Sequence, residues 1–142
     1  MSARGDRLAV VLRVRRIQEE LRQADLARAL AAAAAAEQET RTAHERYLAS
    51  AGVPDPGAAA AFRAARERAG GRARHVAQAG ARYELALGDT ERARVLLTEA
   101  RTRTSGLERL VDRARELAHR ELLAADQREA DESASRDGGA WL

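Results

Sequence analysis

The sequence predicts an all-α protein, an antiparallel two-helix coiled-coil hairpin whose second helical arm is the longer one. Both prolines of the chain, Pro54 and Pro56, fall in one short stretch, and proline ends or kinks helices. The sequence on either side of that stretch is rich in Ala, Arg, Leu and Glu, which favour helices. A single interruption between two long helical runs is typical of a helical hairpin.

The composition favours a thin interface between two helices over a thick globular core. Aromatic residues make up only 3% of the 142 residues, and alanine supplies most of the apolar fraction. Small side chains let two helices approach closely, but they cannot fill the interior of a three-layer globule. We therefore expect residues 1–142 to form a single coiled-coil domain.

The first helix is expected over about residues 6–50, because Asp6 is a good N-cap residue. The loop is expected over residues 51–57, which include both prolines. The apolar positions of this first helix follow helical spacing at Leu8, Val11, Leu12, Leu26, Leu30 and Ala33.

The second helical arm is expected over about residues 58–135, followed by a flexible tail over residues 136–142. Gly70-Gly71 interrupts the arm, because two glycines cost about 2 kcal/mol relative to two alanines in a helix. The pair favours a kink or a short break there. Gly138-Gly139 is expected to stop the helix before the chain ends.

The second arm carries a clear heptad repeat, which predicts the seam of the coiled coil. Its apolar and small residues recur in steps of three and four from Val76 to Ala118, which is an a/d pattern. Large residues alternate with Ala or Thr, as in tightly packed antiparallel pairs. The large members of this predicted seam are Val76, Tyr83, Leu97, Leu107 and Val111.

The sequence contains no pattern typical of an active site, so we expect no enzyme, no cofactor and no metal. There is no cysteine, which excludes disulfides and thiolate metal sites. The three histidines, His44, His75 and His119, lack a second cluster of metal-ligating residues. Neither glycine pair has the strand, loop and lysine of a phosphate-binding motif. No signal peptide is visible, and the longest uncharged run is far too short to span a membrane.

The charges favour a solvated or protein-binding surface over a nucleic-acid surface. The net charge is only +3, and acidic and basic residues are interspersed. Arginines cluster locally, but glutamates interrupt the clusters and no aromatic platform accompanies them. Two alternatives to a protein-binding role in a larger machine stay open: a basic coiled coil that associates with nucleic acid, and a generic scaffolding coiled coil.

Both ends of the chain resemble the flagellar export protein FliJ family. Residues 7–19 (RLAVVLRVRRIQE) are similar to the Leu- and Val-rich, Arg-containing helix that opens the family, and Leu26-Ala27-Arg28-Ala29 continues the pattern. Residues 126–134 (DQREADESA) are similar to the helix near the C-terminus of the family. The length and the helix–loop–longer helix order agree with this resemblance.

The resemblance implies a non-enzymatic, soluble stalk of the bacterial flagellar type III export apparatus. Its implied partners are the hexameric export ATPase, the membrane export gate protein and export chaperones, with no small-molecule ligand. The implied location is cytoplasmic, at the inner face of the cell membrane beneath the flagellum. The residues that we expect to contact partners are Leu8, Val11, Leu12, Arg15, Phe62, Arg128, Asp131 and Glu132.

Overall fold

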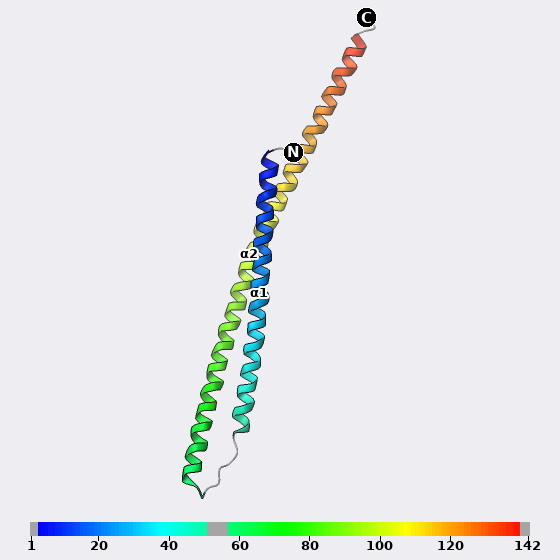
Figure 1. Cartoon of the computed structure of the whole chain (residues 1–142). Helices are drawn as coiled ribbons and strands as arrows, with labels where there is room; N and C mark the ends of the chain where they lie inside the picture. Colours follow the sequence, from blue (N-terminus) through cyan, green and yellow to red (C-terminus); the bar gives the residue numbers. More distant parts are fainter. Residues whose placement is uncertain (1–2, 51–56, 140–142) are drawn as a thin grey trace. The chain divides into compact units, whose positions relative to one another are not determined.

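A computed structural model describes residues 3–50 and 57–139, and nearly all of them are helical (Figure 1). Helix α1 spans Ala3–Ala49 and helix α2 spans Ala59–Gly139. No strand occurs in the described ranges. The predicted all-α class is confirmed. Of the predicted loop over residues 51–57, all but Gly57 lies outside the described residues, and so do residues 140–142 of the predicted tail.

Both helices extend further than the sequence predicted. Helix α1 begins at Ala3 instead of near Asp6, so Asp6 lies in the first helical turn. Helix α2 continues to Gly139, so residues 136–139 are helical where we expected a flexible tail. Asp6 and Arg136 explain part of this extension. A carboxylate in the first turn and a guanidinium in the last turn each interact favourably with the partial charge of the helix end.

Helix α2 passes through Gly70 and Gly71 without interruption, so the structure does not contain the break that the glycine pair favours. No described glycine has a positive φ. Glycine lowers helix propensity but keeps its backbone donor, so it weakens a helix without ending it. Half-buried Ala69 and Val76 on either side of the pair show that α2 stays packed across it.

The helices pack as two compact units, which are described separately. Unit 1 consists of Met1–Glu20 and Glu99–Leu142, and unit 2 consists of Leu21–Thr98. Within each unit the segments of α1 and α2 run antiparallel (Figure 1). In unit 1, Arg16 pairs with Glu108 at 3.1 Å, and Glu19 pairs with Arg101 at 3.7 Å. A later residue of α1 thus meets an earlier residue of α2, as antiparallel helices require.

The core of each unit is a narrow seam of small and medium-sized side chains. Every position of the a/d series from Val76 to Ala118 is buried or half-buried. Along α1 the seam follows positions 5, 8, 12, 15 and 19 and continues through 26, 29, 33, 36, 40 and 43, all of them buried or half-buried. Alanines provide most of the fully buried apolar residues, which are Leu12, Ala33, Ala43, Ala79, Ala93, Leu97 and Val111.

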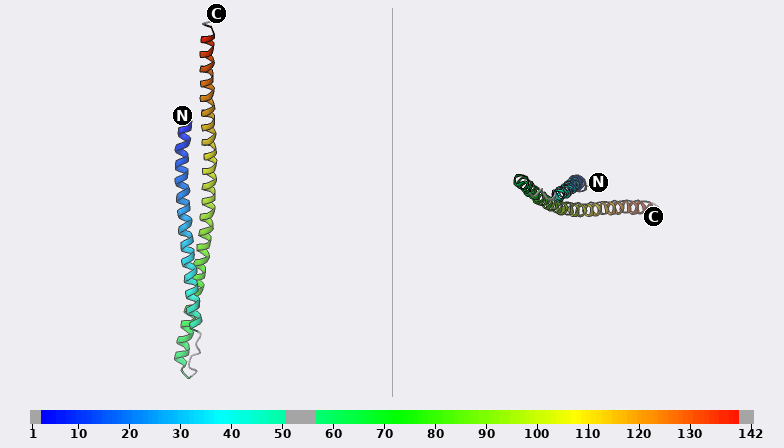
Figure 2. Two further views of the ribbon diagram at one scale, coloured as in Figure 1. Left: turned by 90° about the vertical axis from the view of Figure 1, so that its right-hand side faces the viewer. Right: turned by 90° about the horizontal axis from the view of Figure 1, so that it is seen from below.

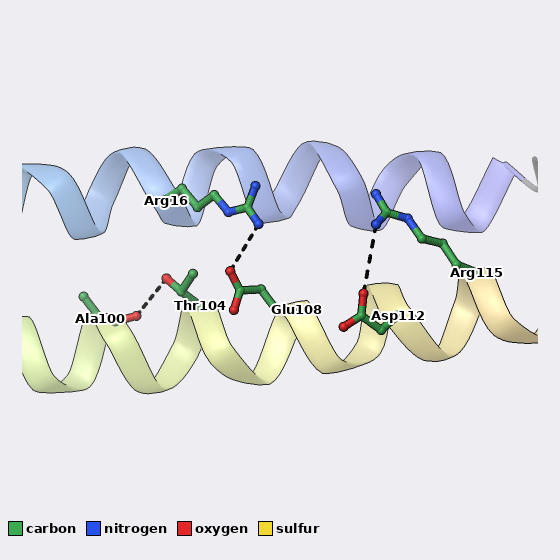
Figure 3. A network of polar contacts seen from close by, with 6 residues as sticks. All are labelled: Arg16, Ala100, Thr104, Glu108, Asp112 and Arg115. Atoms are coloured by element: carbon green, nitrogen blue, oxygen red, sulfur yellow. Dashed lines mark hydrogen bonds and ion pairs between the residues drawn. The ribbon is translucent and has the colours of Figure 1, made fainter.

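Two threonines are buried in this seam, and both hydroxyls are satisfied within their own helix. Thr90 Oγ1 donates to the carbonyl of Ala86 at 3.0 Å, and Thr104 Oγ1 donates to that of Ala100 at 3.0 Å (Figure 3). A buried hydroxyl without a partner would destabilise the fold, but a bond to the preceding turn removes that cost. The described residues contain no buried side-chain nitrogen or oxygen without a hydrogen-bond partner.

The C-terminal end of α1 is capped within unit 2. The backbone nitrogen of Ser50 donates to the carbonyls of Arg46 and Tyr47 at 3.2 and 3.1 Å. A guanidinium nitrogen of Arg72, on α2, also donates to the Arg46 carbonyl at 3.2 Å. The last carbonyls of a helix have no partner within the helix, so these donors explain why α1 ends stably here.

Candidate protein-binding surface

The first candidate surface lies in unit 1, where the first turns of α1 meet α2. Leu8 and Leu12 face the seam, and Leu12 is 6% exposed. On the flank of the seam, Arg16 pairs with Glu108, while Arg115 and Asp112 pair along α2 at 4.0 Å (Figure 3). These exposed ion pairs contribute little to the stability of the fold, but they place charged side chains at the side of the seam.

Beside this seam, unit 1 contains a groove of about 470 Å³ between the two helices. Its floor is apolar because leucines and alanines form it, and its rim carries two arginines and one glutamate. The lining residues are Arg4, Leu8, Leu110, Arg113, Ala114, Leu117, Ala118 and Glu121. A groove with an apolar floor and a charged rim is suited to the amphipathic face of a helix.

A second apolar surface follows the outside of α1 in unit 1. Val10, Val14 and Ile17 are separated by four and three residues, so they share one face of the helix. All three are exposed, Val10 by 60%, so this face points away from the seam. Several exposed aliphatic side chains in a row indicate a surface for a protein partner more than a solvated one. The spacing is visible in the sequence, but it lies outside the a/d pattern that predicts the seam.

The α1 residues predicted to contact partners are unequally accessible. Val11 is exposed, whereas Leu8 and Arg15 are half-buried and Leu12 lies in the core. A guanidinium nitrogen of Arg15 donates to Gln18 Oε1 at 3.0 Å, so Arg15 lies along its own helix. Leu12 therefore presents almost no surface to a partner, while Val11 and the edge of Leu8 remain available.

The α2 residues predicted to contact partners lie beyond the part of unit 1 that α1 covers. All described residues from 119 to 139 are exposed, and Figure 2 shows this end of α2 continuing past the start of α1. Arg128 Nε donates to the Ala124 carbonyl at 3.1 Å, Asp131 accepts from Gln127 at 2.9 Å, and Glu132 pairs with Arg136 at 3.7 Å. The structure thus does not bring these residues against Leu8 or Arg15. They form a separate charged surface on the same unit.

Phe62 belongs to unit 2 and is 50% exposed. Tyr47, also in unit 2, is exposed as well, although the sequence did not single it out. In a chain with four aromatic residues, two exposed ones in one unit are suited to anchoring a partner, because aromatic side chains dominate many interfaces.

The described residues contain no group of three or more His, Cys, Asp or Glu side chains that could hold a metal ion. No helix within them carries an apolar stretch of the length that a membrane crossing requires.

Comparison with protein families identifies the chain. The family model described as flagellar FliJ protein matches residues 4–139. The chain belongs to the FliJ family. The FliJ family is a non-enzymatic component of the bacterial flagellar export apparatus, and it serves flagellum biogenesis, protein export and motility. A search of curated proteins found no match, and neither did a search of solved structures.

Proposed function

We propose that this FliJ-family protein is the coiled-coil stalk that binds the hexameric export ATPase ring and couples it to the membrane export gate and to export chaperones. It would work in the cytoplasm, attached peripherally at the inner face of the cell membrane. The observation that supports the proposal is the set of exposed surfaces in unit 1. It combines the opening helix of the chain, with its exposed Val10, Val14 and Ile17, and an uncovered end of α2.

Unit 1 suits a contact with the inside of a protein ring. Residues 4–16 of α1 contain five arginines and one aspartate, while residues 122–139 of α2 contain five carboxylates and two arginines. A basic stretch of α1 and, further along the same unit, an acidic helix end can each meet charged groups of the opposite sign inside a lumen. Arginine keeps its charge and can pair with carboxylates through two nitrogens. The exposed valines and Ile17 add an apolar contact that salt does not weaken.

We assign the export gate to the other unit. The exposed side chains of Tyr47 and Phe62 in unit 2 provide the aromatic anchors that buried interface centres favour. Replacing both with alanine should weaken binding of the cytoplasmic part of the gate while the ATPase responds normally.

The ATPase contact is tested with the cognate export ATPase in a pull-down and a turnover assay. The wild-type chain should bind the ATPase and promote ring assembly or turnover. Arg15→Glu with Arg128→Glu should weaken binding by about tenfold at low salt, and by less at high salt, because exposed charges are screened. The matched control is Arg63→Glu with Arg66→Glu, the same charge change at exposed positions of unit 2.

A nucleic-acid shift assay on the same proteins separates the alternatives. Tight, salt-sensitive nucleic-acid binding with no effect on the ATPase would reject the stalk and favour a nucleic-acid-associated coiled coil. Absence of both activities would leave a generic scaffold as the better explanation.

A further inference from the structure

The positive charge of this chain is concentrated in one short segment of unit 2. Residues 59–75, at the start of α2, contain five arginines and one glutamate, which give a net charge of +4. The other 20 of the 25 arginines and 21 of the 22 carboxylates leave the rest of the chain with a net charge of −1. The positive net charge therefore comes entirely from this segment. Its five arginines, all exposed, are Arg63, Arg66, Arg68, Arg72 and Arg74.

None of these arginines forms an ion pair with a carboxylate among the described residues. Arg68 and Arg72 each donate to a backbone carbonyl, at 3.3 and 3.2 Å. Arg63, Arg66 and Arg74 form no hydrogen bond or ion pair with any described residue. Most other arginines of unit 2, by contrast, pair with an aspartate or a glutamate. Three guanidinium groups are therefore available to anions outside the chain.

The three unpaired arginines share the face of α2 that points away from the seam. Because a helix turns by about 100° per residue, Arg63, Arg66 and Arg74 fall within about 80° of one another around the axis. The other residues of this face are small: Ala59, Gly70, Ala73 and Ala77. Glu67, the carboxylate of the segment, lies at the edge of the face. A broad anionic surface can thus reach all three guanidinium groups without meeting a bulky side chain.

In unit 2 the first turns of α2 lie past the end of α1. Arg72 contacts the carbonyl of Arg46, so it lies beside the last turn of α1, which ends at Ala49. Figures 1 and 2 show the start of α2 continuing beyond that end. Every residue from 59 to 68 is exposed except half-buried Ala65. This part of α2 is therefore accessible to a large partner.

We infer that this arginine face, formed by Arg63, Arg66 and Arg74, binds the anionic headgroups of a lipid bilayer. The inference deepens the proposed peripheral attachment and rests on it, because it gives unit 2 a direct contact with lipid in addition to its contact with the gate. Each arginine near an anionic leaflet raises the partition coefficient about fivefold, so three raise it about 100-fold. The contact is electrostatic and does not require insertion into the bilayer.

The composition of the face favours lipid over a folded protein or a nucleic acid. Protein interfaces have an apolar or aromatic centre, whereas only alanine and glycine lie among these arginines. Tight binding of a nucleic acid needs contacts with about six to ten phosphates, and the rest of the chain, with its net negative charge, adds no attraction. For lipid, a few contacts suffice, because the proposed gate contact already holds unit 2 at the membrane and the two contacts reinforce each other.

The inference is tested by sedimentation of the full chain with lipid vesicles, in the absence of ATPase and gate. Vesicles of phosphatidylcholine with about 30 mol% phosphatidylglycerol supply anionic headgroups, and pure phosphatidylcholine vesicles are the neutral comparison. The wild-type chain should bind the anionic vesicles about 100-fold more tightly than the neutral ones, and less tightly as salt rises. Arg63→Glu with Arg66→Glu should weaken binding to the anionic vesicles by about tenfold or more, because two attracted charges become repelled ones.

The matched control is Arg92→Glu with Arg94→Glu, the same charge change at exposed positions of unit 2. Arg92 lies 18 residues beyond Arg74, about 27 Å along α2 and more than a Debye length away, so this variant should bind within about twofold of the wild type. Circular dichroism of each variant verifies that the helices remain intact. Absence of binding, equal binding to neutral vesicles, or equal losses in the two variants would each overturn the inference.

The outcome is separable from that of the proposed ATPase contact. Arg63→Glu with Arg66→Glu is also the control variant of the ATPase assay, which contains no lipid, so one protein reports on both contacts. A wild-type chain that binds the ATPase but no vesicles would reject the lipid contact and keep the stalk. A chain that binds anionic vesicles through these arginines but has no effect on the ATPase would do the reverse. Binding of duplex DNA through the same arginines, without vesicle binding, would assign the face to nucleic acid and overturn the inference.

Discussion

Replacing interior glycines of α2 with alanine should stabilise this protein strongly. Each interior glycine adopts a helical backbone, and a helical glycine is less favourable than alanine by about 1 kcal/mol. A Cβ atom built at Gly70 or Gly80 meets no heavy atom within 4 Å. At Gly71 it meets only the tip of the Arg74 side chain, at 3.9 Å. The substitutions therefore remove a propensity cost without adding a clash.

The expected magnitude follows from these three positions, all of which lie in unit 2. The propensity cost belongs to the backbone of each glycine separately, so the three effects should sum to about 3 kcal/mol. For a unit of this size such a gain raises the midpoint of thermal unfolding by about 10 to 20 °C. Thermal unfolding of the triple variant Gly70→Ala, Gly71→Ala and Gly80→Ala, followed by far-UV circular dichroism, measures the change.

Two controls make the result decisive. Ala77→Gly, at an exposed interior position of α2, should lower stability by about 1 kcal/mol, the reverse of a single glycine replacement. Gly138→Ala should change little, because the last turn of a helix frays. If the triple variant melts at the wild-type temperature while Ala77→Gly is destabilised, then α2 is not helical through Gly70-Gly71, and the reasoning is refuted.

Three further predictions test the seam and the surface by denaturant unfolding. Leu97→Ala should cost about 2–5 kcal/mol, because Leu97 is 4% exposed, whereas Leu85→Ala at a 68% exposed position should stay within about 0.5 kcal/mol. Equal losses for the two leucines would show that the seam is placed wrongly. Thr104→Val should change stability by less than about 1 kcal/mol, since its hydroxyl bonds only to its own helix. Arg82→Ala breaks a 2.7 Å ion pair between the helices with Glu39, and it should cost no more than about 1 kcal/mol at low salt and less at high salt.

The seam of α2 could be predicted from the sequence because large residues and Ala or Thr alternate there with a strict heptad period. The seam of α1 was harder to predict, because half-buried Arg15 and Glu19 occupy seam positions while apolar Val11 and Leu30 lie exposed outside it. In this part of the chain, hydrophobic character does not report burial. A long charged side chain can bury its aliphatic stem in a thin seam and still reach water with its charged group.

The exposed apolar surfaces could not be located from hydrophobic character alone either. The exposed Val10, Val14 and Ile17 are visible in the sequence, but only the structure shows which apolar face of α1 remains uncovered. The groove is lined by residues of both helices, so predicting it requires the register in which α1 packs on α2. That register cannot be read from the sequence of either helix alone. The ends of the helices were missed by a few residues because Asp6 and Gly138 are compatible with more than one boundary.

The uncovered end of α2 gives the molecule a helix–coil equilibrium at one end. Residues 122–139 have no tertiary packing, and an isolated helix of this length is marginally stable in water. Its helicity depends on the packed turns before it, which serve as the nucleus. When a partner binds this segment, the contact must offset the conformational entropy that the segment loses on becoming ordered. The affinity is therefore lower than the contact area alone suggests. Binding at this segment is therefore weaker, and more readily reversed, than binding of a pre-ordered helix with the same contact area.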